Sequence, residues 1–239
     1  MQIPRFPECY HPLIETTLGH DDQELLQRFC QYPGAGRYFV AIFCRYSPLV
    51  YSLIHHAAQS AVQVDYLFAQ AWQQIYQELQ SVSPEHFAQA DQSSSDDGEP
   101  ALPQDSGTRG EELNLSHGTD APLTLQNWII DSVAQCIHDS AIPDAEKIRY
   151  ALTYASPPLW CYLNQSLERL SPIHRLVMLL HKRFGWSVEE VSAYLTSQKA
   201  AVNTATVITL LEESYDHTSE SLPQDIRDIY LSPANLKQT

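Results

Sequence analysis

The sequence predicts an all-α protein, and three observations lead to that fold class. Apolar residues recur at helical spacing along most of the 239-residue chain, only 8 residues are Gly, and no long alternation of apolar and polar residues is present. A length of 239 residues is enough for two small cores or for one domain with extensions, and because 44% of the residues are hydrophobic we expect most of the chain to fold. We therefore expect two helical domains, with an acidic insertion inside the first.

The N-terminal part is expected to form an irregular arm followed by helices. Residues 1–20 are rich in Pro, and a helical pattern starts at Asp21, which suits an N-cap. A long helical pattern over 38–58 contains Pro48, which predicts a kink or a new helix start at Ser47. The first domain is predicted to span residues 21–142, with further helices over 64–79 and from 123 to the break at Pro143.

The segment 81–123 differs sharply from its surroundings in composition. Between residues 91 and 120, eight acidic residues accompany one Arg and almost no large apolar side chain. Such a segment buries too little apolar surface to offset its ordering entropy, so we expect a disordered acidic insertion. Two interpretations follow, a solvated linker or a regulatory acidic arm that occupies a basic surface.

The C-terminal part is predicted to be a linker, a helical domain and a tail. Asp144 is expected to cap a short helix over 147–154 within a linker at 143–158. The domain at 159–215 is expected to contain helices over about 159–170, 172–184, 187–195 and 199–215. The tail, 216–239, carries a small apolar cluster that predicts either a short docked helix or a motif for a partner.

Local signals mark tight turns inside the domain at 159–215. Gly185 occupies the position just past a helix end, and Ser187 with Glu190 forms a capping box for the next helix. Short amphipathic helices joined by tight turns are typical of a helix-turn-helix, whose outward helix can enter a DNA major groove. We therefore predict a helix-turn-helix fold for this domain.

Four segments of the sequence carry the functional interpretation. The first three cover residues 38–51, 65–76 and 125–139. The fourth contains Leu170, Pro172, Arg175, Val177 and Leu180, followed by Phe184, Ser187, Glu190, Val191 and Leu195. In this order the segments resemble the motifs of the bacterial sigma-70 family of RNA polymerase sigma factors, in particular the small two-domain extracytoplasmic-function type.

The resemblance implies a transcription initiation factor that binds RNA polymerase core and directs it to promoter DNA, with an anti-sigma or other regulatory protein as a further partner. It implies polymerase contacts at Asp65, Tyr66, Ala69, Gln70 and Gln73. It implies promoter contacts at Asn127, Trp128 and Gln135, with Trp128 either in the core or acting as a wedge between separated strands. The helix-turn-helix would add Arg175, Lys182, Arg183, Ser187, Gln198, Lys199, Asn203, Thr204 and Thr206.

The charge of the chain supports a second hypothesis. Fourteen Lys and Arg face 29 Asp and Glu, which gives a net charge of −15 and repels phosphate backbones. The expected recognition helix has Lys199 as its single cation, and the basic cluster before it is either a backbone contact or a solvated helix face. The alternative function is therefore a degenerate sigma-derived interaction or regulatory protein that does not read DNA.

The cysteines and the absence of catalytic motifs limit the remaining possibilities. The five Cys are odd in number and contain no CxxC, no signal peptide is recognised, and no apolar stretch reaches membrane-spanning length. We therefore expect a cytoplasmic protein with reduced thiols and no membrane span. No phosphate-binding loop, metal-ligand spacing or nucleophile motif is recognised, so neither enzyme activity nor a cofactor is expected.

Overall fold

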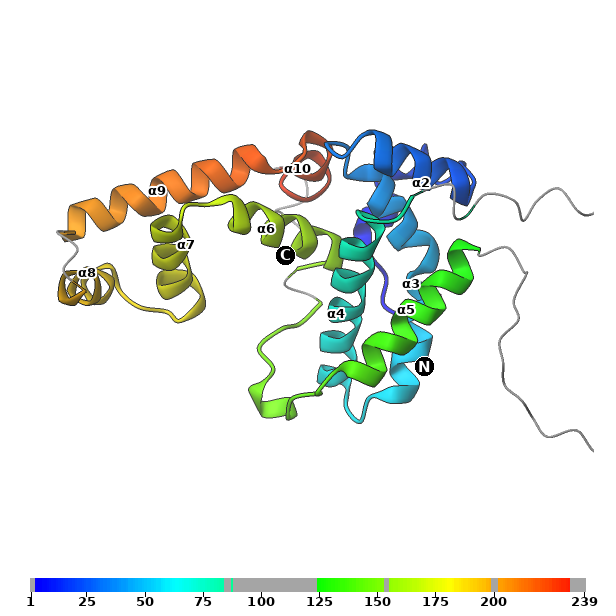
Figure 1. The fold of residues 1–239 in the computed structure, drawn as a ribbon, viewed down its shortest axis with the longest axis horizontal. Coiled ribbons are helices and arrows are strands. Elements are labelled where there is room, and N and C mark those ends of the chain that lie inside the picture. Colours follow the sequence, from blue (N-terminus) through cyan, green and yellow to red (C-terminus); the bar gives the residue numbers. More distant parts are fainter. Residues whose placement is uncertain (1–2, 84–86, 88–123, 153–154, 199–201, 233–239) are drawn as a thin grey trace, which may run out of the picture.

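The structure is a computed structural model that describes residues 3–83, 87, 124–152, 155–198 and 202–232, and this part of the chain is all helical. Figure 1 shows α2 to α5 gathered at one end, α7 and α8 at the other, and α6 and α9 running between them. The elements are η1 (Pro7–Tyr10), α1 (Pro12–Glu15), α2 (Asp22–Gln31), α3 (Arg37–Ala57), α4 (Ala61–Leu79), α5 (Leu125–Asp139), η3 (Ala145–Lys147), α6 (Pro157–Arg169), α7 (Pro172–Met178), η4 (Leu179–Arg183), α8 (Val188–Ser197), α9 (Thr204–Ser221) and α10 (Gln224–Tyr230).

The larger apolar core is centred on α4, which packs against α3, α5 and α6. Aromatic side chains fill it, because Trp72 lies edge-on to Phe39, Phe43 and Phe68 with ring centroids 4.9–6.3 Å apart. Such contacts add to the large apolar area that each ring buries. The helix predicted over 64–79 is confirmed, and its aromatic residues lie on the face that packs in the core.

Pro48 lies inside a single helix, so the new start considered at Ser47 is wrong. Helix α3 runs from Arg37 to Ala57 with Pro48 on its exposed side. A proline in a helix interior removes one hydrogen bond and costs about 3 kcal/mol or more. Buried residues on both sides of it, Phe43 and Val50 among them, keep the two halves in one helix through tertiary packing.

The N-terminal segment differs from the irregular arm expected over 1–20. It forms η1 and α1, and Ile14 is completely buried. Phe6 packs against Phe43 and Phe68 at ring-centroid distances of 4.8 and 5.6 Å. A disulfide joins Cys9 to Cys44 on α3, so the expectation of reduced thiols is wrong for this pair. Two cysteines 35 residues apart in the chain meet only because the arm folds back onto α3.

The boundary between the two apolar clusters lies after α6, later than the predicted linker at 143–158. In residues 143–152 the short 3-10 helix η3 forms, and the helix expected over 147–154 is absent from the described residues 147–152. Helix α6 itself joins the larger core through Cys161 and Tyr162, both 2% exposed. The Cys161 thiol donates to the carbonyl of Trp72 at 3.7 Å, and burial raises the pKa of that thiol.

The second apolar cluster is formed by α7, η4, α8 and α9, which we call the C-terminal unit. Its buried members are Val177, Leu180, Val191, Leu195, Val207 and Leu211. Gly185 has a φ of +70°, and the capping box between Ser187 and Glu190 is present, so both local predictions are confirmed. The helix expected over 172–184 is α7 followed by the π-helical turn η4.

The last long helix begins later than predicted. Helix α9 starts at Thr204 because the side chain of Asn203 accepts a hydrogen bond from the Thr206 N–H at 2.9 Å, and it continues to Ser221. Lys199, expected at the start of this helix, lies outside the described residues. The tail then forms α10, which docks on the larger core through Ile226, so the docked-helix alternative is confirmed.

Most of the acidic insertion predicted over 81–123 lies outside the described residues, and so does the expectation that it is disordered. Residue 87 is described, and the Phe87 side chain is 7% exposed. In the described part of the chain, no helix combines the length and apolarity that crossing a membrane requires.

Candidate functional site

Several residues predicted to contact DNA serve as helix caps in the C-terminal unit. The Ser187 hydroxyl accepts from the Glu190 N–H at 3.2 Å, and the Glu190 carboxylate accepts from the Ser187 N–H at 2.7 Å. The Asn203 side chain accepts from both the N–H and the hydroxyl of Thr206, at 2.9 and 3.0 Å. A side chain that leaves such a cap exposes unsatisfied N–H groups. Ser187, Asn203 and Thr206 would therefore have to give up hydrogen bonds at helix ends in order to bind DNA.

Arg175 is turned inward, toward the end of α6. Its guanidinium donates to the carbonyl of Leu167 at 3.0 Å, to that of Leu170 at 3.4 Å, and to that of Glu168. The last carbonyls of a helix lack intrahelical partners, and a cation there also interacts favourably with the helix dipole. Arg175 therefore joins α7 to α6 and is not an outward basic contact.

The remaining cations of the predicted basic cluster lie on η4. The Lys182 ammonium sits over the Tyr215 ring of α9, 5.3 Å from its centroid, and Arg183 is exposed. Such a cation–π contact is worth about 0.5–1 kcal/mol at an exposed site, so a phosphate can compete for the lysine. Of the three cations predicted to meet the DNA backbone, Arg175 is bonded to α6, Lys182 is partly engaged, and Arg183 is exposed.

The other predicted base-reading residues are small and exposed or half-buried. Gln198 is exposed at the end of α8, Thr206 is exposed in the first turn of α9, and Thr204 is half-buried beside it. Lys199, predicted to act with them, lies outside the described residues. Thr204 and Thr206 make the first turn of α9 polar.

The outward face of α9 is acidic. Glu212, Glu213, Asp216 and Glu220 are exposed, and this helix contains no Lys or Arg. Glu213 also pairs with His174 of α7 at 2.9 Å. Each carboxylate brought close to a phosphate backbone opposes the counterion release on which DNA affinity depends.

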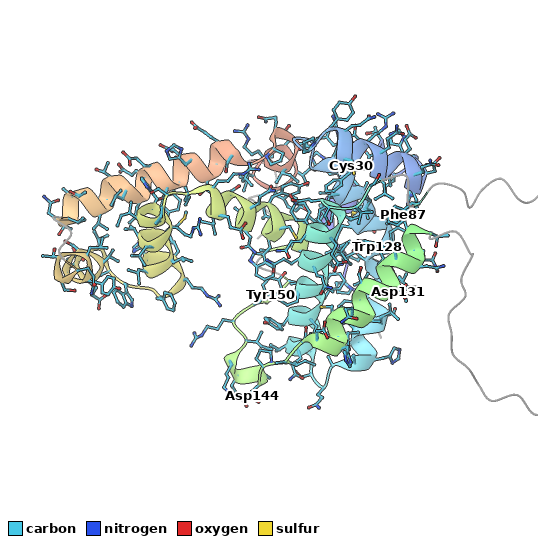
Figure 2. All side chains as sticks on the ribbon, in the orientation of Figure 1. Cys30, Phe87, Trp128, Asp131, Asp144 and Tyr150 are labelled. Atoms are coloured by element: carbon cyan, nitrogen blue, oxygen red, sulfur yellow. A yellow bond between two sulfur atoms is a disulfide. The ribbon has the colours of Figure 1, made fainter. Side chains whose placement is uncertain are left out.

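The predicted melting helix, α5, keeps part of its expected surface. Asn127 and Gln135 are exposed, and Asp131 is exposed between them. Trp128 is half-buried and meets the Phe87 ring edge-on at 5.9 Å, and Figure 2 labels both residues together with Asp131. The indole packs at the edge of the larger core, which agrees with the core alternative for Trp128.

The residues predicted to bind polymerase do not form an open surface. Ala69 is fully buried, whereas Asp65, Tyr66, Gln70 and Gln73 are half-buried on a helix covered on three sides. The Asp65 carboxylate accepts from the Leu152 N–H at 3.5 Å, and burial raises its pKa. The segment before α6 therefore lies over one end of this predicted site.

Sequence reasoning missed two buried carboxyl groups, Glu8 and Asp225, which are 6% and 8% exposed. Glu8 lies in the predicted arm and Asp225 in the tail, and nothing in the local pattern marks either as buried. Apart from the adjacent Ile226 N–H, which donates to Asp225, the hydrogen-bond partners given for these side chains are at least 148 residues away in the sequence, so only the folded chain reveals them.

Arg175→Ala is expected to reduce the stability of the protein more than its affinity for DNA. Removing the guanidinium leaves the end carbonyls of α6 without their donor, and because the group is partly exposed we expect a loss of about 1 kcal/mol in unfolding free energy. Urea denaturation measures the loss, and Arg183→Ala is the matched control at an exposed cation. A variant that keeps full stability and loses nucleic-acid binding would return Arg175 to the DNA-contacting set.

No group of three or more His, Cys, Asp or Glu in the described part of the chain lies close enough to hold a metal ion. In comparisons with known proteins, no family model, no curated protein and no solved structure matches this chain.

Proposed function

We propose that this chain is a sigma-like regulatory protein that acts through protein contacts and does not read promoter DNA through α9. The order of the four sigma-like motifs supports the transcriptional setting. The succession of α7, η4, α8 and α9 around one apolar cluster supports a second domain of helix-turn-helix type.

One observation carries the second half of the proposal. Three side chains predicted to contact DNA are instead engaged at helix ends, namely Arg175, Ser187 and Asn203. The exposed face of α9 carries four carboxylates and no Lys or Arg. A protein that makes few phosphate contacts gains little affinity from counterion release. An acidic surface of this kind is complementary to a basic protein surface.

The proposed partner is RNA polymerase core, with an anti-sigma-type regulator as the second class of partner. The protein would act in the cytoplasm, and this role requires neither catalysis nor a cofactor. The Cys9–Cys44 disulfide departs from the reduced thiols that a cytoplasmic setting predicts.

An initiation factor is the competing function, because Gln198 and Thr206 are exposed near the start of α9 and Arg183 is exposed on η4. These groups are suited to base edges and to one phosphate contact. Promoter reading through so few contacts would depend on polymerase supplying most of the positive surface.

Two measurements with the full chain and its cognate core polymerase separate these functions. We expect a pull-down to retain core, and in vitro transcription to give no promoter-specific transcript above core alone. Arg183→Glu should leave both results unchanged, as should Arg149→Glu, an exposed cation outside the C-terminal unit. A specific transcript that Arg183→Glu abolishes and Arg149→Glu spares would establish the initiation factor, and failure to retain core would remove polymerase as the partner.

A further inference from the structure

The first turn of α3 lacks a cap from its own segment and receives one from α10. The N-cap position is Gly36, which has no side chain to accept a hydrogen bond. The Asp225 carboxylate takes this role, because it accepts from the Gly36 N–H and the Arg37 N–H, each at 2.9 Å. A carboxylate at a helix N-terminus satisfies orphan donors and interacts favourably with the dipole.

A second carboxyl group, that of Glu8, holds the other end of α10. Its Oε1 accepts from the Tyr230 hydroxyl at 3.3 Å and from the Ser156 hydroxyl just before α6. Three segments therefore meet at one buried carboxyl: the N-terminal η1, the start of α6 and the end of α10. Each of these polar contacts joins parts of the chain that are distant in sequence.

Among the described residues that influence the ionisation of Glu8, none carries a positive charge. The groups facing it are the hydroxyls of Ser156 and Tyr230 and its own backbone N–H, and the phenol of Tyr150 interacts with it at longer range. From α3, Cys44 contacts η1 through its disulfide with Cys9, in which neither sulfur titrates. A buried carboxylate without a counter-charge is costly, and hydroxyl donors compensate only part of that cost.

The apolar contact under α10 is small. This seven-residue helix buries Ile226 and Ile229 completely or nearly so, together with the adjacent Leu222. Isolated helices of this length are unstable in water, so α10 persists only while it is docked. The polar contacts of Asp225 and Glu8 are therefore a large part of what holds it.

We propose that α10 is a proton-linked latch, which docks on the N-terminal helices while Glu8 is protonated and opens when Glu8 ionises. Leu222 and Pro223 alone join α10 to α9, and α9 itself also packs against α6. Opening also leaves the N-terminus of α3 without an acceptor. The inference does not depend on which partner the protein binds.

The direction of the pH dependence follows from the burial of Glu8. Burial raises the pKa of Glu8, so the docked state holds the proton more tightly than the released state does. Docking is then at full strength below the released-state pKa of about 4.3 and weakens as the pH rises through the docked-state pKa. Burial also raises the pKa of Tyr230, whose hydroxyl keeps its proton across this range.

Hydrogen exchange of the full chain over a pH series tests the latch. After correction for intrinsic exchange, we expect protection of residues 224–231 and of the first turn of α3 to fall by up to about tenfold per pH unit between the released-state and docked-state pKa values of Glu8, and to level off above the docked-state pKa. Glu8→Gln, an isosteric change that cannot ionise, should keep protection constant with pH. Asp228→Asn, on the exposed side of α10, is the matched control and should behave like the wild type.

Asp225→Ala separates docking from proton linkage. It should lower protection of α10 and of the first turn of α3 at every pH and leave the slope unchanged, because Glu8 remains. The NMR titration of the Glu8 carboxyl in the wild type gives a measurement that needs no variant, and its midpoint should coincide with the pH at which the loss of protection levels off. A wild type with constant protection, or a Glu8→Gln variant with the wild-type slope, would overturn the latch.

Discussion

Trp72→Ala lowers the free energy of unfolding by about 3–5 kcal/mol, the largest single-site effect that we expect in this protein. Trp72 is completely buried at the centre of the larger core, among Phe39, Phe43 and Phe68. Truncation removes the apolar transfer energy of the ring and leaves a cavity between α3, α4 and α6. Urea denaturation followed by far-UV circular dichroism measures the loss.

The indole N–H places this value toward the lower end of the range. Within the described residues it is buried without a hydrogen-bond acceptor, and an unpaired buried donor costs about 1–3 kcal/mol. Trp72→Phe keeps an aromatic ring and removes that donor, so its loss should be only about 1 kcal/mol. Gln73→Ala, the half-buried neighbour on α4, serves as the control and should stay within about 0.5 kcal/mol of the wild type. A loss below about 1 kcal/mol for Trp72→Ala would contradict the central position of α4.

Gly36→Ala has the second-largest expected effect, a loss of about 1–3 kcal/mol from overpacking where α10 meets α3. A Cβ at this position would lie 2.3 Å from Cγ1 and 2.5 Å from Cδ1 of Ile226, and 3.1 Å from Cζ of Tyr162. The φ of Gly36 is −68°, which alanine adopts readily, so the effect isolates the collision from backbone strain. Thermal unfolding and protection of α10 against hydrogen exchange report it.

Two comparisons make the Gly36 result specific. Gly34→Ala lies in the same turn with nothing within 4 Å of its new Cβ and should be close to neutral. The double variant Gly36→Ala with Ile226→Ala should cost less than the sum of the two single variants, because removing the Ile226 side chain relieves the collision. Strict additivity would mean that α10 does not rest on Gly36.

The elements whose limits depend on local chemistry were predictable from the sequence. The capping box at Ser187 and the left-handed Gly185 are decided by contacts within six residues, and the structure has both. The helical spacing of apolar residues likewise predicts α2, α4 and α5 to within a few residues, because one buried face repeats every turn.

The roles of the predicted functional residues could not be inferred from local sequence in the same way. Arg175 has the residue type expected of a phosphate contact, but its orientation is set by the carbonyls of α6. Asn203 fits base reading equally well and is instead a cap that moves the start of α9 to Thr204. Residue type identifies what a side chain can bind, whereas competition among nearby partners decides what it does bind.

By itself, the sequence determined the all-helical class, the turns around residue 185 and the acidic character of α9, because these follow from local spacing, local caps and composition. Only the tertiary structure decided that α6 belongs to the larger core, that Cys9 meets Cys44, and that Glu8 and Asp225 hold α10. These contacts join residues 35 to 222 positions apart, and their free energy arises from burial and desolvation that exist only after the chain has folded.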